Sequence, residues 1–200
     1  MEANGRSSCH VGTVAKPLRV TVLFDTSTLL LALDPGAKPP LDPATTQPLE
    51  HARWRIEYLI RTLSKAKAKV LIPAPVLAEV LVHAGSAAND YVQSLQQSPF
   101  RVAPFDTRAA IEWAAGMARS GSTSKRKAAP WAKVKFDHQI IAVAKVEDVE
   151  TIYSDDGDIY TLAKRAGLNV VRSFELPLDP DDKQLRLRFE EDRPSRPPVT

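Results

Sequence analysis

The spacing of apolar and polar residues along the chain predicts strands and helices in alternation. Five short runs are almost continuously apolar, which is typical of strands buried on both faces of a parallel sheet. They span 18–24, 69–72, 100–105, 151–153 and 168–171. The segments between them place apolar residues at helical spacing. This alternation predicts an α/β fold in which helices cover both faces of a five-stranded parallel sheet.

Helix boundaries follow from the same spacing and from capping residues. Helices are expected over 28–33, 49–68, 76–82, 87–97, 108–119, 137–145 and 159–165. Thr26 and Ser27 are expected to cap the first helix, and Thr107 the fifth. Asp137 is expected at the positive N-terminus of the sixth. The apolar positions expected to face inward in helix 108–119 are Ile111, Ala114, Ala115 and Ala118.

Composition divides the 200 residues into a domain and two extensions. Residues 1–17 are polar and without periodicity, which predicts a flexible lead. Residues 18–176 carry the strand and helix pattern. From 177 onward the chain is charged and rich in proline, which predicts a tail. Within it, 185–189 alternates apolar and basic residues as an edge strand would, although a disordered tail is equally compatible with this composition.

Charge and cysteine usage restrict the class of protein. The formal net charge of +3 is too small to establish a polyanionic partner by itself. Cys9 is the only cysteine, so an intramolecular disulfide and a thiolate metal cluster are excluded. The sequence has no N-terminal apolar signal and no apolar run approaching the roughly 20 residues of a membrane span. We therefore expect a soluble cytoplasmic protein with no membrane partner.

Acidic side chains follow or flank several of the predicted strand ends. They are Asp25, Glu79, Asp137 and Asp156. In an open parallel sheet these ends form one edge, where ligands bind. Three of the acids have a plainer interpretation: Asp25 as a helix cap, Glu79 directed to water, and Asp137 placed for the helix dipole. A shared site explains all four together.

Four carboxylates in one pocket would repel each other unless a cation lies among them. Mg²⁺ and Mn²⁺ prefer hard oxygen ligands, whereas a set without histidine and cysteine argues against zinc. Such ions activate water for displacement at a phosphodiester. His138 is expected to lie on the surface or beside the ligands, not to bind the metal.

Basic residues precede the third acid in sequence. Contacts from lysine and arginine to phosphate supply most sequence-independent affinity for nucleic acids. A solvated loop is the alternative, and Trp131 could stack on a base or anchor that loop. The candidate nucleic-acid-binding residues are Lys125, Arg126, Lys127, Lys133 and Lys135.

At the acidic residues the sequence resembles the PIN-domain ribonuclease family, most closely its VapC-like toxin branch. The resemblance covers about 18–171. It is carried by Leu-Phe-Asp-Thr-Ser at 23–27, the helix entry at 75–79, Asp137 with the apolar 140–142, and Ser-Asp-Asp-Gly-Asp at 154–158. It implies a three-layer fold, dependence on Mg²⁺ or Mn²⁺, and cleavage of single-stranded RNA. Frequently such proteins form a homodimer that an antitoxin neutralises.

The resemblance also assigns roles to residues. The family's catalytic metal ligands fall on Asp25, Glu79, Asp137 and Asp156. Asp158 matches a further acid, and Ser154 a hydroxyl position. Thr26 and Asp155 are expected beside the ligands, although the family often has a neutral residue in place of Asp155. The proline-rich loop after Gly36 and the long tail exceed a compact toxin.

Two other functions are open at this point. One is a catalytically idle PIN-like module that binds RNA or a protein. The other is a phosphatase or response regulator, which Asp25 fits poorly because no second aspartate follows two residues later. The sequence also lacks a glycine-rich phosphate loop.

Overall fold

The computed structural model describes residues 20–119 and 131–181. The expected lead, most of the expected tail and the segment 120–130 lie outside these ranges. Lys125, Arg126, Lys127 and the run 185–189 therefore lie outside the described residues as well.

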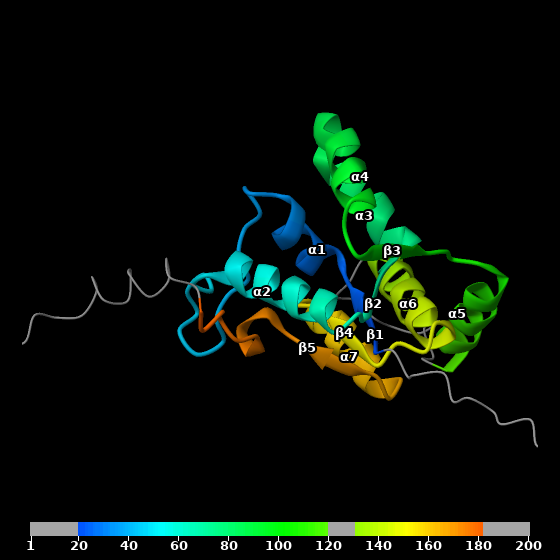
Figure 1. Cartoon of the computed structure of the whole chain (residues 1–200). Coiled ribbons are helices and arrows are strands. Elements are labelled where there is room, and N and C mark those ends of the chain that lie inside the picture. The colour runs from blue at the N-terminus through cyan, green and yellow to red at the C-terminus, as the bar shows by residue number, and fades with distance from the viewer. Residues whose placement is uncertain (1–19, 120–130, 182–200) are drawn as a thin grey trace, which may run out of the picture.

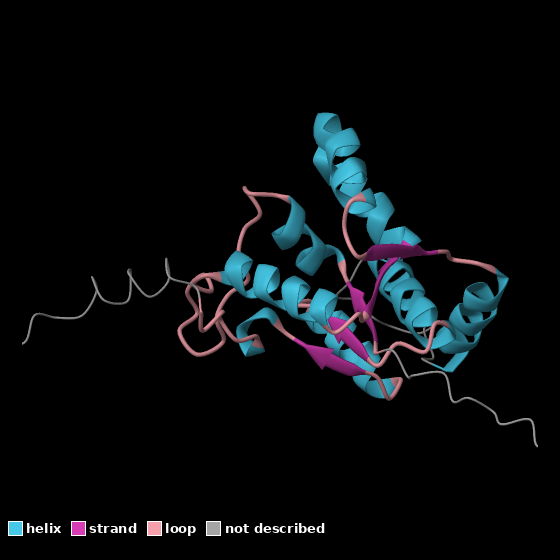
Figure 2. Cartoon of the chain, viewed as in Figure 1, coloured by secondary structure: helices cyan, strands magenta, loops and turns pink. Residues whose placement is uncertain are grey.

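A five-stranded parallel sheet forms the centre of the fold, as the apolar runs predicted (Figure 2). Its strands lie in the order β3-β2-β1-β4-β5. Their bounds are β1 Thr21–Phe24, β2 Lys69–Pro73, β3 Phe100–Ala103, β4 Thr151–Tyr153 and β5 Asn169–Val171.

Both faces of the sheet are buried. Successive side chains of a strand point to opposite faces, and in β1 the fully buried Leu23 belongs to a different apolar cluster from its buried neighbours Val22 and Phe24. The rings of Phe100 and Tyr153 each meet Phe24 edge to face, at centroid distances of 5.5 and 5.4 Å. Burial on both faces explains why the strands are continuously apolar in sequence.

The helices cover the two faces unequally. The amphipathic α2 packs on the Phe24 side, and α3, α6 and α7 contribute to the cluster on the Leu23 side. Figure 1 shows α3 and α4 projecting from the body of the molecule. The helices are α1 Thr26–Leu33, α2 Ala52–Lys65, α3 Ala74–Ala84, α4 Ala88–Gln96, α5 Thr107–Arg119, α6 Trp131–Val146 and α7 Gly157–Arg165, with short 3₁₀ turns η1 Gly85–Ala87 and η2 Ser173–Glu175.

Three expectations about helices are wrong. Helix α6 begins six residues earlier than expected, so Asp137 lies in its interior and not at its positive end. The side chains of Asp25 and Asp106 accept the first-turn backbone N–H groups of α1 and α5, in place of the expected threonine and serine caps. In α5 the residue Ile111 is 67% exposed, whereas Ala109 is buried.

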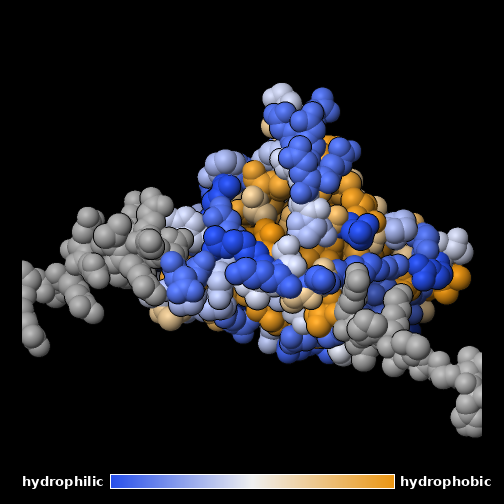
Figure 3. Space-filling view, in the orientation of Figure 1, coloured by the Kyte–Doolittle hydropathy of each residue, from blue (hydrophilic) through white to orange (hydrophobic). Residues whose placement is uncertain are grey.

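The surface is mixed in polarity. The outer end of α4 is mostly hydrophilic, whereas apolar side chains gather nearer the body of the molecule (Figure 3). Among the exposed large apolar side chains are Val82 on α3 and Val102 on β3. None of the helices in the described ranges is both long and apolar enough to cross a membrane.

The sheet has a topological switch point between β1 and β4. After β1 the chain continues to its neighbour β2 on one side, whereas after β4 it continues to β5 on the other. The two connections therefore leave in opposite directions and open a crevice at the carboxyl ends of these strands, where ligands bind in this class of sheet. Asp25 follows β1 directly, and Ser154 follows β4.

Candidate active site

Asp25 lies buried at the end of β1, where it also begins α1. It is 3% exposed. Its Oδ1 accepts the backbone N–H of Thr28 at 3.0 Å and the hydroxyl of Ser27 at 2.9 Å, and its Oδ2 accepts the hydroxyl of Ser154. The cap interpretation of Asp25 is therefore correct, and it does not exclude a place in the acidic site.

The turn after β4 holds the next acids. Asp156 caps α7, since its Oδ1 accepts the N–H groups of Asp158 at 2.7 Å and Ile159 at 3.2 Å. Asp158 lies in the first turn of the helix, where the helix dipole favours a carboxylate. Asp155 points elsewhere, because both of its oxygens accept hydrogen bonds from Ser173.

Glu79 reaches the site from α3. It is exposed, in keeping with the interpretation that its side chain is directed to water. Its Oε2 accepts a hydrogen bond from the hydroxyl of Thr26. That contact joins the start of α1 to α3 and places both side chains at the same edge of the sheet.

One cleft brings the four predicted ligands together. Its volume is about 560 Å³, and its lining includes Asp25, Glu79, Asp137 and Asp156. They come from the first residue after β1, from α3, from α6 and from the cap of α7. Side chains separated by more than 130 positions in sequence, such as Asp25 and Asp156, thus face the same space.

Lys133 lies among these acids, a position that differs from the predicted phosphate contact. Its Nζ is 3.1 Å from Asp137 Oδ2, 3.1 Å from Asp156 Oδ2 and 2.7 Å from Asp158 Oδ2. The side chain reaches there because Lys133 precedes Asp137 by one helical turn. In this structure Lys133 binds carboxylates of its own chain.

Burial sets the protonation of the two innermost acids. It raises the pKa of Asp25 to about 6, although hydrogen bonds from Ser154, Thr28 and Ser27 work in the opposite direction. Burial likewise raises the pKa of Asp137 to about 6 against the attraction of Lys133. Carboxyl groups with raised pKa values in a cleft are candidates for a functional site.

The pKa of Asp156 is shifted in the opposite direction from those of Asp25 and Asp137. Burial disfavours the charged form of Asp156, yet Lys133 and the two backbone N–H groups outweigh it and lower its pKa. The three carboxylates raise the pKa of Lys133 above its usual value, despite desolvation of the ammonium.

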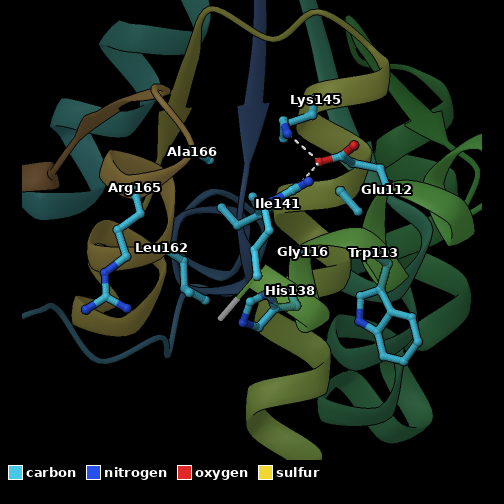
Figure 4. A pocket seen from close by; sticks show the side chains of 11 residues that line it. Glu112, Trp113, Gly116, His138, Ile141, Lys145, Leu162, Arg165 and Ala166 are labelled. Atoms are coloured by element: carbon cyan, nitrogen blue, oxygen red, sulfur yellow. Dashed lines mark hydrogen bonds and ion pairs between the residues drawn. The ribbon is translucent and has the colours of Figure 1, made fainter. Parts of the chain in front are cut away.

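A second cavity, of about 380 Å³, lies between α5, α6 and α7 (Figure 4). It is lined by His138 and Trp113, and Glu112 is bonded there to Lys145 and Arg119. His138 is buried and lines this cavity, not the acidic cleft, which differs from its expected position on the surface or beside the ligands. None of the acids in the first cleft lines this cavity.

The donor chemistry of the first cleft fits a hard divalent cation. It offers carboxylate oxygens, and no cation is among the described residues that form hydrogen bonds with the buried Asp25. In the described ranges, however, no three acidic, histidine or cysteine side chains are arranged to hold an ion together. Three of the carboxylates surround the Lys133 ammonium instead.

Sequence reasoning missed two participants. Ser27 was expected only as a helix cap, yet it donates to Asp25 and accepts the N–H of Asp155 at 3.3 Å. Lys133 was predicted to contact RNA phosphate, although its spacing of four residues from Asp137 is a recognisable signal for a helical ion pair.

Ser154→Ala is expected to destabilise the fold by about 2 kcal/mol, because a buried oxygen of Asp25 would lose its donor. The pKa of Asp25 would rise further, since the Ser154 hydrogen bond lowers it. Urea unfolding at neutral pH measures the change. The control is Ser64→Ala at an exposed position of α2, and equal effects of the two substitutions would contradict this role of Ser154.

The chain is similar to several solved structures, of which the first described here, with a TM-score above 0.5, supports the fold. A chain of the VapBC2 complex of Rickettsia felis, solved with a DNA fragment from its promoter, has a TM-score of 0.51 at 12% identity, covering 76% of this chain and 98% of the other. The sarcin–ricin loop cleaving toxin VapC20 of Mycobacterium tuberculosis gives 0.46 at 14% identity, covering 70% and 93%. The DNA-bound VapBC of Salmonella typhimurium gives 0.47 at 17%, covering 77% and 98%.

The family assignment rests on the sequence. No curated protein matches the chain. The model of the PIN domain matches residues 50–173, a span that begins after Asp25 and includes Glu79, Asp137, Asp156 and Asp158. The match covers more than half of the chain, so the protein belongs to the PIN domain family.

Proposed function

We propose that the protein is an endoribonuclease that requires Mg²⁺ or Mn²⁺ and cleaves single-stranded RNA. The observation that carries this proposal is the convergence of Asp25, Glu79, Asp137 and Asp156 on one cleft at the switch point of the sheet. Membership of the PIN domain family supports nuclease activity. The phosphatase alternative has no comparable support.

In this proposal the four acids hold the metal, and Asp158 at the cleft edge completes the set. A divalent ion held by these residues would supply the Lewis acidity that activates water and stabilises the leaving oxygen of a phosphodiester. Ser154 orients Asp25, and Thr26 orients Glu79, through the hydrogen bonds already described. Asp155 contributes indirectly, since its backbone N–H fixes the Ser27 hydroxyl that donates to Asp25.

RNA as a substrate fits a cleft that holds a divalent cation. Five carboxylates, balanced by only one described lysine, would repel phosphate oxygens unless such a cation lies between them. Lys135 is exposed on α6, two residues from Lys133, and stays a candidate for phosphate contact. The proposal extends to Lys125, Arg126 and Lys127 from their position in sequence alone.

The proposal also includes a role as a toxin that forms a homodimer and has an antitoxin partner. The similar Rickettsia felis chain was solved as part of a VapBC2 complex, which is consistent with such a partner. Light scattering of the purified protein tests the dimer. Recovery of growth on co-expression of a neighbouring open reading frame tests the antitoxin.

A catalytically idle PIN module that binds RNA or protein is the second candidate. It is favoured by the ammonium of Lys133, which already forms ion pairs with three of the acids. An idle module would bind RNA equally well in chelator and would not cleave it.

Purified protein is expected to cut single-stranded RNA in Mg²⁺ or Mn²⁺ and to leave it intact in chelator, because the acids alone supply no electrophile. Labelled single-stranded and duplex RNA are compared on denaturing gels. Cleavage that persists in chelator would contradict metal dependence. Binding without cleavage under every metal condition would favour the idle module.

A further inference from the structure

Lys133 is the only cation among the described residues that line the acidic cleft. Its side chain is 39% exposed, whereas that of Asp137 is 7% exposed. The ammonium therefore lies at the boundary between the buried acids and solvent.

Lys133 contacts as many carboxylates as its ammonium has N–H donors, with hydrogen bonds to Asp137 and Asp158 and an ion pair with Asp156. An ammonium carries three N–H donors, and its Nζ lies within 3.1 Å of three different carboxylates, those of Asp137, Asp156 and Asp158. Two of these carboxylates, Asp137 and Asp156, are proposed metal ligands, and the third lies at the edge of the same site. A divalent cation would need the same oxygens.

The remaining two acids are satisfied differently. Asp25 accepts hydrogen bonds from Ser27, Ser154 and a backbone N–H, and Glu79 accepts one from Thr26. Their hydroxyl partners are neutral and carry no charge that competes with a metal. The Lys133 ammonium would therefore compete with a metal only on the side of the cleft that α6 and α7 form.

We propose that Lys133 is an internal counter-ion that competes with the divalent metal and sets the metal concentration at which the site fills. In the metal-free state the ammonium draws α6 and the start of α7 together. When the metal binds, the ammonium leaves for solvent, which its partial exposure permits without unpacking the core. This inference rests on the proposed metal-dependent function and assigns to Lys133 control over its cofactor.

The competition is expected to be moderate. Ion pairs that are partly exposed are individually weak and reversible, so the metal can displace the ammonium. Lys133→Met removes the charge and keeps most of the length of the side chain. We expect this variant to bind Mn²⁺ roughly tenfold more tightly than the wild type, because three weak ion pairs no longer have to be broken.

The test is calorimetric titration of the full metal-free chain with MnCl₂, together with thermal melts in chelator. Lys164→Met is the matched control, because Lys164 is exposed on α7 and its Nζ lies 5.5 Å from the Tyr160 ring centroid, not among the acids. The control should bind Mn²⁺ like the wild type. In chelator Lys133→Met should melt below the wild type, since the acids lose their counter-ion. Lys133→Gln repeats the test with a polar side chain in case the methionine variant does not fold.

The outcomes separate the two proposals. Tighter Mn²⁺ binding by Lys133→Met or Lys133→Gln, with Lys164→Met unchanged, supports the counter-ion role. Equal or weaker binding by the Lys133 variants, when the wild type does bind Mn²⁺, overturns that role and leaves the metal site intact. If none of the proteins binds Mn²⁺, the metal-dependent function fails, and the competition fails with it.

Discussion

Asp25→Asn and Asp137→Asn are each expected to reduce metal-dependent RNA cleavage by at least about a hundredfold, because loss of groups that only support metal ligands already costs 10–100-fold. Both residues lie in the cleft, and both are buried. Asparagine keeps the size of the side chain but offers one neutral oxygen, which binds a hard cation less well. Initial rates on a labelled single-stranded RNA in Mg²⁺ and Mn²⁺ measure the effect.

The folded state should survive these substitutions. Asparagine is as good a helix cap as aspartate, and its oxygen can accept the Thr28 N–H and the Ser27 hydroxyl that Asp25 accepts now. The amide nitrogen would then face Ser154, whose hydroxyl can also accept. Circular dichroism confirms folding, and Asp106→Asn, at an aspartate cap outside the cleft, is the activity control. Near wild-type rates for either cleft variant would refute the ligand assignment.

The same Asp25→Asn substitution is expected to stabilise the metal-free protein at pH 7.5. Burial raises the pKa of Asp25 from 3.8 to about 6. Between these values the unfolded chain releases the proton while the folded chain retains it, so the free energy of unfolding falls as pH rises through this window. With about 1.4 kcal/mol for each pKa unit, the ionised Asp25 destabilises the fold by about 3 kcal/mol above pH 6.

Urea unfolding of both proteins in chelator, from pH 3.5 to 7.5, measures this difference. The gain of the variant should grow between pH 4 and 6 and then stay constant. Asp106→Asn should show the opposite sign, because hydrogen bonds from Ala109 and Arg108 lower the pKa of that carboxyl and its stabilisation is present at neutral pH. A variant at position 25 that is less stable than the wild type at pH 7.5 would show that Asp25 acts only as a cap.

The strands and the acids could be predicted because their signals are local. A strand buried on both faces must be continuously apolar, as the buried residues Val22, Leu23 and Phe24 show. The parallel order then places every carboxyl end at one edge. This is why Asp25 and Asp156, far apart in sequence, could be expected in one cleft.

Other features depend on how the helices dock and have no local signal. Ile111 is exposed because α5 packs against α6 through a different stripe, on which Trp113 donates to the backbone carbonyl of Lys135 at 3.2 Å. The ion pair of Lys133 with Asp137 could have been predicted from the sequence, but the contact of Lys133 with α7 could not.

The earlier start of α6 did have a signal in the sequence, since Pro130 precedes Trp131 and proline is common near the start of a helix.

The position of β1 in the middle of the sheet has a consequence for when the cleft comes into existence. The hydrogen bond between Ser154 and Asp25 joins residues 129 positions apart. Contacts of such separation form late, since the entropy of closing a long loop opposes them until other structure has formed. A chain emerging from the ribosome would hold Asp25 long before β4 and the cap of α7 have been synthesised. We therefore expect any cleavage activity to arise only in the last steps of folding, after β4 and the cap of α7 have been synthesised.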